Sequence, residues 1–135
     1  MPSIPLISIV DDDDALRMAL ENLIRSVGLR AQGFSSAEAF LRSNQLHETA
    51  CLILDVCMPG MSGLELTTHF RNQPNGKRPC IISVTSYAMD SDRERAFAAG
   101  CDGYITKPID TRMFADEVLR IMSARAHTEA VGASA

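Results

Sequence analysis

The chain lacks the features that mark membrane-embedded and secreted proteins. Its longest stretch without an acidic or basic residue is eleven residues, from Pro79 to Met89. A membrane-spanning helix needs roughly 18 apolar residues. No lysine or arginine precedes Asp11, so the basic segment that opens a secretory signal is missing. We therefore expect a cytoplasmic protein with no membrane partner.

Clustered basic residues and metal-binding cysteine motifs are also missing. The chain has 13 Lys and Arg against 17 Asp and Glu, a net charge of −4, whereas neutralising nucleic-acid phosphates calls for clustered Lys and Arg. Its four cysteines are Cys51, Cys57, Cys80 and Cys101. They form no CxxC pair and have no paired histidine, so zinc-binding and thioredoxin-type chemistry have no support. We expect buried, reduced thiols and no direct nucleic-acid partner.

The composition is that of one globular domain with a hydrophobic core. Of 135 residues, 46% are hydrophobic and 22% charged. Short apolar runs alternate with amphipathic segments, a pattern typical of a parallel sheet covered by helices on both faces. Five such units predict five helices and five strands, the strands at residues 6–10, 29–34, 51–54, 80–84 and 104–106. There is no internal repeat.

Capping residues predict where several helices begin and end. Capping boxes, in which a serine is followed three residues later by a glutamate, mark helix starts. The pairs are Ser35 with Glu38, Ser62 with Glu65, and Ser91 with Glu94. Asp110 is a good N-cap for the last helix. From residue 124 onward the chain turns to Ala, Gly and Ser, so we expect a domain over residues 1–123 and a flexible C-terminal tail over 124–135.

Polar and charged residues stand where the predicted strands end. Asp11 and Asp12 follow the first strand, Asp55 the third, Thr85 the fourth and Lys107 the fifth. In a doubly wound sheet, ligands bind outside the carboxyl ends of the strands. Carboxylates gathered there repel one another unless a cation neutralises them, and hard oxygen ligands suit Mg²⁺. The pattern predicts a magnesium and phosphate site.

A carboxylate in such a site has a specific chemistry open to it. Asp55 can attack an activated phosphoryl group and become an aspartyl phosphate. The ammonium of Lys107 and the hydroxyl of Thr85 can neutralise the oxygens of the transferred group.

The four consecutive aspartates have two simpler interpretations. Asp13 and Asp14 are interpreted as a solvated turn whose negative charge favours the N-terminus of the following helix. A calcium-binding EF-hand loop is excluded, because Leu16 and Asn22 occupy the positions that require Gly and Glu.

Four short motifs follow one another along the chain. They are Val10-Asp11-Asp12, then Leu54-Asp55 with Met58-Pro59 and Gly63, then Val84-Thr85-Ser86, and finally Gly103-Tyr104-Ile105-Thr106-Lys107-Pro108. Together they resemble the receiver domain of two-component response regulators, over about residues 4 to 123. The resemblance implies a flavodoxin-like, doubly wound, five-stranded parallel sheet of order 2-1-3-4-5 with five helices.

The resemblance also implies a role for each site residue. Asp55 is expected to be the phosphoacceptor and a magnesium ligand. Asp12 is expected to bind Mg²⁺ directly, Asp11 partly through water, and Cys57 through its backbone carbonyl. Lys107 is expected to bridge to the phosphoryl group from a cis bond to the following proline.

A switch and its partners follow from the same resemblance. Thr85 is expected to move toward the phosphoryl oxygens and Tyr104 to turn inward with it. The face formed by the fourth helix, fifth strand and fifth helix then changes its affinity for a partner. The phosphoryl donor is expected to be a sensor histidine kinase or a phosphotransfer protein. The readout is expected to be a downstream protein, a missing output domain or a phosphorylation-dependent homodimer. We expect no enzyme activity beyond self-phosphorylation and self-dephosphorylation.

Two alternatives remain open. One is the receiver portion of a DNA-binding transcriptional regulator whose output domain is absent here, because residues 36–41 resemble receivers joined to helix-turn-helix domains. The other is a phosphohydrolase of the haloacid dehalogenase type, which also uses an aspartate nucleophile and Mg²⁺. That class needs a second aspartate two residues after the first, where this chain has Cys57.

Overall fold

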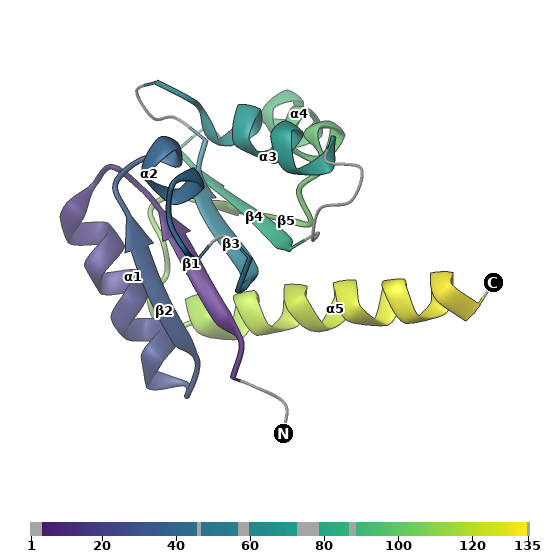
Figure 1. Cartoon of the computed structure of the whole chain (residues 1–135), viewed down its shortest axis with the longest axis horizontal. Coiled ribbons are helices and arrows are strands. Elements are labelled where there is room, and N and C mark those ends of the chain that lie inside the picture. The colour runs from purple at the N-terminus through teal and green to yellow at the C-terminus, as the bar shows by residue number, and fades with distance from the viewer. Residues whose placement is uncertain (1–3, 46, 57–59, 73–78, 87–88, 135) are drawn as a thin grey trace.

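Strands and helices alternate along the whole chain (Figure 1). The structure is a computed structural model that describes residues 4–45, 47–56, 60–72, 79–86 and 89–134, with side chains up to residue 125. Its elements are β1 Leu6–Val10, α1 Asp14–Ser26, β2 Arg30–Phe34, α2 Ala37–Leu41, β3 Thr49–Asp55, α3 Gly63–Arg71, β4 Cys80–Thr85, α4 Asp90–Ala99, β5 Gly103–Thr106 and α5 Phe114–Ser134. The strands pair in parallel in the order β2-β1-β3-β4-β5, which confirms the predicted sheet.

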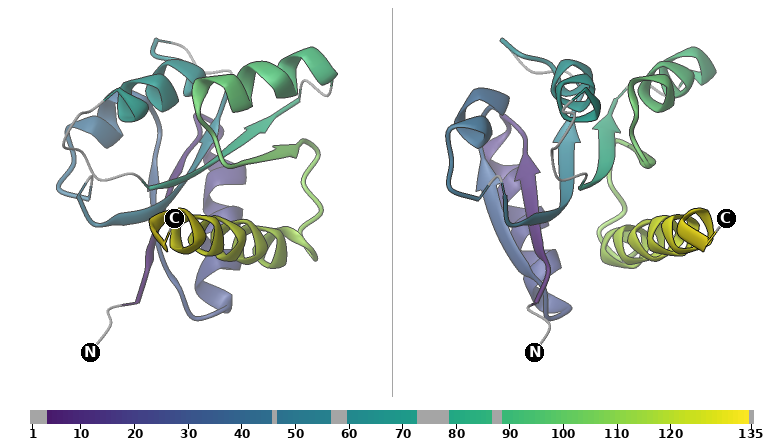
Figure 2. Two further views of the ribbon diagram at one scale, coloured as in Figure 1. Left: turned by 90° about the vertical axis from the view of Figure 1, so that its right-hand side faces the viewer. Right: turned by 45° about the vertical axis from the view of Figure 1, so that its right-hand side comes forward.

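Side chains of the central strands alternate between two apolar layers. On β3, Cys51 and Ile53 face one layer, and Leu52 and Leu54 face the other. Helices α1 and α5 cover the first layer, and α2, α3 and α4 cover the second (Figure 2). Because successive side chains of a strand point to opposite faces, a continuous apolar run is what a strand buried on both faces requires.

Main-chain hydrogen bonds continue beyond the strand ends and align the loops that leave the sheet. The amide of Asp11 donates to the carbonyl of Phe34 at 3.1 Å, and that of Lys107 to the carbonyl of Thr85 at 2.7 Å. Between them, the amide of Val56 donates to the carbonyl of Val84 at 3.0 Å. The residues that follow the strands are therefore held at one level along this edge.

One of the three predicted capping boxes marks a helix start. The hydroxyl of Ser62 accepts from the amide of Glu65 at 3.2 Å and caps α3, as expected. The prediction at Ser35 is wrong by one residue, because Ser36 caps α2. Glu38 instead accepts a long hydrogen bond of 3.5 Å from the amide of Met61, so a tertiary contact replaces the local box.

The remaining two predicted starts are also wrong. Helix α4 begins at Asp90, which places Ser91 inside its first turn. Helix α5 begins at Phe114 rather than after Asp110. Asp110 caps the short turn before the helix, where its carboxylate accepts from the amide of Arg112 at 3.0 Å.

Residues 124–134, which belong to the tail predicted over 124–135, form the end of α5. The helix continues without a break to Ser134 and projects past the sheet (Figure 1). Arg125 anchors its extension, since its Nε lies 3.3 Å from Oδ1 of Asp102. The other carboxylate oxygen of Asp102 accepts from Nη2 of Arg71 at 2.8 Å. This network ties α3, α5 and the turn before β5 together at the end of the sheet away from the acidic residues.

The described cysteines are free thiols, as expected. Cys51, Cys80 and Cys101 are all buried. Cys51 and Cys80 are register partners on β3 and β4, and a hydrogen bond between them, with burial, raises the pKa of Cys51 well above its ordinary value. Cys57 lies outside the described residues.

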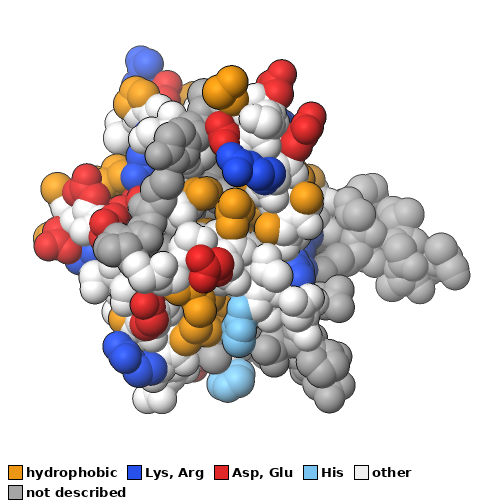
Figure 3. All heavy atoms as spheres, turned by 90° about the horizontal axis from the view of Figure 1, so that it is seen from above, with side chains coloured by type: hydrophobic (Ala, Val, Ile, Leu, Met, Phe, Trp, Pro, Cys, Tyr) orange, Lys and Arg blue, Asp and Glu red, His pale blue; other side chains and the backbone are white. Residues whose placement is uncertain are grey.

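The surface carries charges of both signs. On the face shown in Figure 3, basic side chains are scattered among acidic and hydrophobic ones. Among the described residues, no helix combines the length and the apolar character needed to span a bilayer.

We expect Gly63→Ala to destabilise the protein, because a Cβ at this position lies closer than 3.0 Å to the backbone oxygen of Asp55. Overpacking of this kind costs about 1–3 kcal/mol. Chemical denaturation measures the loss. Gly33→Ala is the control, since its Cβ meets only side-chain atoms of Glu21 and Arg17, which can move. Equal stability of the two variants would contradict this packing argument.

Candidate functional site

Three carboxylates meet at the carboxyl edge of the sheet. Asp11 and Asp12 follow β1, and Asp55 is the last residue of β3. One oxygen from each lies within 4.8 Å of the others. Asp11 and Asp55 are buried, at 2% and 6% exposure, whereas Asp12 is exposed. The fold thus brings together the acidic residues that the sequence singles out.

Lys107 extends from the end of β5 into this cluster. Its Nζ lies 3.3 Å from Oδ2 of Asp55 and 3.4 Å from Oδ2 of Asp11. Burial alone favours the neutral amine, but the charges of Asp11 and Asp55 and hydrogen bonds to them outweigh burial and raise the pKa of Lys107. The ammonium therefore stays charged between the two buried carboxylates. The predicted cis bond between Lys107 and Pro108 is present.

The turn after β1 orients Asp11 with a second set of hydrogen bonds. Oδ1 of Asp11 accepts from the amide of Asp13 at 2.9 Å, and its carbonyl accepts from Nη1 of Arg17 at 2.8 Å. Asp13 itself caps α1 through the amide of Leu16, and Arg17 pairs with the exposed Asp14. The interpretation of Asp13 and Asp14 as helix-start residues agrees with these contacts.

Arg17 is a residue of the site surroundings that sequence reasoning missed. Its side chain is 16% exposed and links the turn after β1 to the first turn of α1. The i, i+3 spacing from Asp14 was the available signal, because residues at this spacing are neighbours on a helix.

The first residue of α3, Gly63, packs against the backbone of Asp55, the predicted phosphoacceptor. The amide of Gly63 donates to the carbonyl of Val56 at 3.2 Å, so the start of α3 lies against the end of β3. Cys57, whose carbonyl is a predicted metal ligand, lies outside the described residues.

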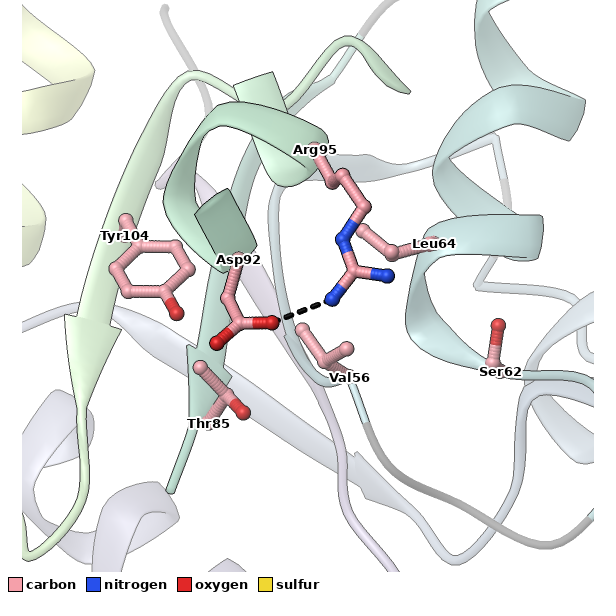
Figure 4. Close-up of a pocket in the computed structure, with 7 residues that line it drawn as sticks. All are labelled: Val56, Ser62, Leu64, Thr85, Asp92, Arg95 and Tyr104. Carbon is pink, nitrogen blue, oxygen red and sulfur yellow. Dashed lines mark hydrogen bonds and ion pairs between the residues drawn. The ribbon is translucent and has the colours of Figure 1, made fainter. Parts of the chain in front are cut away.

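Thr85 and Tyr104 line one cavity beside the acidic cluster (Figure 4). Its volume is about 320 Å³. It is lined by Val56, Ser62, Leu64, Thr85, Asp92, Arg95 and Tyr104. Thr85 is almost fully buried at the end of β4, and Tyr104 is half-buried on β5. The two predicted switch residues therefore line the same cavity.

Burial raises the pKa of Tyr104, and the negative charge of Asp92 raises it further. Its hydroxyl is therefore neutral at physiological pH. Asp92 and Arg95 were not predicted as part of this region. Their i, i+3 spacing on an acidic helix start was the only sequence signal.

The donor set fits a hard divalent cation. Asp11, Asp12 and Asp55 offer three carboxylates against the single ammonium of Lys107, which leaves excess negative charge in a largely buried space. Carboxylate oxygens are what Mg²⁺ prefers, and it usually takes only a few of them from the protein. The side chain of Lys107 and the exposed edge at Asp12 leave the cluster open to solvent on one side.

The family model for the response regulator receiver domain matches residues 7–119. The chain belongs to the response regulator receiver family. Two similar sequences are the response regulator protein TmoT of Ectopseudomonas mendocina and the phosphate regulon transcriptional regulatory protein PhoB of Rhizobium meliloti. TmoT is 42% identical over 103 residues, covering 76% of this chain and 46% of TmoT. PhoB is 36% identical over 114 residues, covering 80% of this chain and 48% of PhoB.

A solved receiver has the same fold. The BeF₃-activated receiver domain of DrrB, a Thermotoga maritima protein, superimposes with a TM-score of 0.77 at 26% identity. The match covers 90% of this receiver and 99% of that domain. The chain spans about half the length of the curated relatives TmoT and PhoB.

We expect Lys107→Met to lower the free energy of unfolding by about 1 kcal/mol at pH 8, measured with a chelator present. This is a low value for charge-assisted hydrogen bonds, because solvent screens the ammonium. The pKa of Lys107 is raised on folding, so its contribution is complete below the unfolded lysine value of about 10.4. It disappears as pH rises through the folded value. Urea unfolding of both proteins from pH 8 to 12 measures whether the stability of wild type falls to that of Lys107→Met.

The control for this series is Arg112→Met, because the side chain of Arg112 is 88% exposed. It should change stability little at any of these pH values. If the free energies of unfolding of wild type and Lys107→Met differ by the same amount up to pH 12, the assigned ion pairs are contradicted.

Proposed function

We propose that this receiver accepts a phosphoryl group on Asp55 from a phosphohistidine of a sensor kinase or phosphotransfer protein. The observation that carries the proposal is the placement of Asp55 beside Asp11 and Asp12, with the Lys107 ammonium 3.3 Å from its Oδ2. A nucleophilic carboxylate, further carboxylates for a cation and a fixed ammonium are the groups that phosphoryl transfer to an aspartate requires.

The transfer is a single displacement at phosphorus. An oxygen of Asp55 forms the new P–O bond while the P–N bond to histidine breaks, and the released imidazole nitrogen keeps the electron pair and takes up a proton. Lys107 and the hydroxyl of Thr85 stabilise the charge on the phosphoryl oxygens. Asp11, Asp12, Asp55 and the carbonyl of Cys57 are the groups that would hold Mg²⁺, which would supply further neutralisation of negative charge there. The chain is thus a phosphoacceptor whose only catalysis is its own phosphorylation and dephosphorylation.

The phosphorylated form signals through Thr85 and Tyr104. In our proposal Thr85 moves toward the phosphoryl oxygens and Tyr104 follows it inward, which changes the face formed by α4, β5 and α5. That face binds a downstream protein, an output domain or a second copy of the chain. Residues 1–123 form the receiver, and we place it in the cytoplasm, where the buried Cys51, Cys80 and Cys101 remain reduced thiols.

A second proposal concerns the protein in which this receiver works. The chain covers 48% of the transcriptional regulatory protein PhoB and 46% of TmoT. This coverage favours the interpretation that the sequence is the receiver portion of a longer regulator with a DNA-binding output domain. Sequencing the coding region downstream of Ala135 tests it, and an immediate stop codon would rule it out.

Incubation with acetyl phosphate and Mg²⁺ should increase the intact mass by one phosphoryl group. Asp55→Asn should show no gain, because an amide is not an effective nucleophile toward phosphorus. The matched control is Asp102→Asn, which removes a carboxylate at the far end of the sheet and should retain the gain. Phosphorylation of Asp55→Asn at the wild-type level would refute the assignment, and turnover of small phosphate esters would favour the phosphohydrolase alternative.

Mg²⁺ alone should raise the midpoint temperature of thermal unfolding, because a ligand that binds only the folded state stabilises it. At a Mg²⁺ concentration 100 times Kd, the free energy of unfolding rises by about 2.7 kcal/mol. Asp12→Asn should remove most of this increase. Asp14→Asn is the control, since Asp14 is also exposed in the same run but pairs with Arg17 instead. An undiminished increase in Asp12→Asn would exclude Asp12 as a ligand.

A further inference from the structure

Tyr104 stands between two cavities. The first, of about 320 Å³, also touches Thr85 and Asp92. The second, of about 280 Å³, lies against Pro108 and Phe114 at the start of α5. Because Tyr104 lines both cavities, rotation about its side-chain bonds can bring the ring toward either one. A neighbouring group can then determine the relative free energies of the two ring positions.

Asp92 occupies the wall of the first cavity. In Figure 4 its carboxylate points into the space between the Tyr104 ring and Thr85. Arg95, one turn further along α4, donates from Nη2 to Oδ1 of Asp92 at 2.5 Å. The side chain of Asp92 is 18% exposed and that of Arg95 is 70% exposed. Arg95 therefore holds the carboxylate from the solvent side while the carboxylate itself faces inward.

The carboxylate and the ring compete for the same space. The pKa of Tyr104 is raised by burial and then by the charge of Asp92, as expected for two groups that line one cavity. Arg95 binds Oδ1 of Asp92, so a ring moving toward Thr85 strips water from the other carboxylate oxygen, and an anion left without solvent is costly.

We propose that Asp92, held by Arg95, is a positioning residue that keeps the Tyr104 ring out of the cavity beside Thr85 until Asp55 is phosphorylated. This inference rests on the proposed function, because it assigns the control of the same switch. It extends that function to two residues of α4. Removal of the carboxylate shifts the unphosphorylated receiver toward the active arrangement, since the equilibrium between two states follows their relative free energies.

Helix α4 supplies a matched control. Asp90 and Asp92 both lie in its first turn, so each interacts with the helix dipole. Asp90 does not line the cavity that Asp92 shares with Tyr104. Replacing either aspartate removes one charge from the same helix start, and only the change at Asp92 alters the cavity.

The test follows the Tyr104 ring directly. The chain has two tyrosines, Tyr87 and Tyr104. Labelling with 3-fluorotyrosine gives two ¹⁹F signals, which the Tyr87→Phe variant assigns. Wild type with beryllium fluoride and Mg²⁺ defines the signal of the active arrangement. Without these additions, Asp92→Ala and the nearly isosteric Asp92→Asn should move the Tyr104 signal toward that position, and Asp90→Asn should leave it in place.

A second measurement links the ring to the reaction. Asp92→Ala should take up a phosphoryl group from acetyl phosphate about three- to tenfold faster than wild type, a range expected for a residue that couples two sites. Asp90→Asn should react at the wild-type rate. An unchanged Tyr104 signal in both Asp92 variants, or a shift away from the active position, overturns the role of Asp92. If wild type gains no phosphoryl group and its Tyr104 signal ignores beryllium fluoride, the proposed function itself fails.

Discussion

One ammonium group between two buried carboxylates is the interaction on which the rest of the site depends. The Nζ of Lys107 lies within 3.4 Å of both Asp11 and Asp55. Without a cation, two nearly inaccessible negative charges at this edge repel each other in a medium of low polarity. The pairing compensates them only in part, because Asp12 adds a third carboxylate. The excess negative charge makes this group of residues suited to hold a further cation.

The sheet makes this charge arrangement possible. Asp11, Asp55 and Lys107 are separated by 44 and 52 residues in the chain, and parallel pairing brings their strand ends to a common edge. The central strand β3 is apolar from Cys51 to Leu54 and ends at Asp55, so a shift of its register into the sheet would bury this carboxylate among apolar residues. Hydrophobic burial thereby determines the positions of the charged groups.

Thr85 connects the charged site to the cavity beneath α4. Its carbonyl accepts from the amide of Lys107, and its side chain lines the cavity that contains Tyr104 and Asp92. In the proposed mechanism, a movement of Thr85 therefore changes the contacts of both Lys107 and the cavity. Coupling in this receiver therefore needs no long pathway, because the proposed phosphoacceptor and the proposed switch meet at the end of β4.

The sequence by itself determined the strands, the parallel sheet class and the identity of the residues at the strand ends. The burial pattern of a strand depends on residues that are neighbours in the chain. The apolar runs, and the residues Asp11, Asp55, Thr85 and Lys107 at their ends, can therefore be identified from the sequence. The order of the strands came from the motifs and their resemblance to receivers, since periodicity carries no information about neighbours. The start of α3 at Ser62 was equally readable, because its cap is a contact within one turn.

Only the tertiary structure decided the contacts made between distant segments. Glu38 bonds Met61 rather than its own helix start, and Arg125 extends α5 by reaching Asp102. Asp92 lines the same cavity as Tyr104 because α4 lies against β5. A hydrogen bond or ion pair of this kind depends on where two remote segments meet in space, and spacing along the chain does not encode that position.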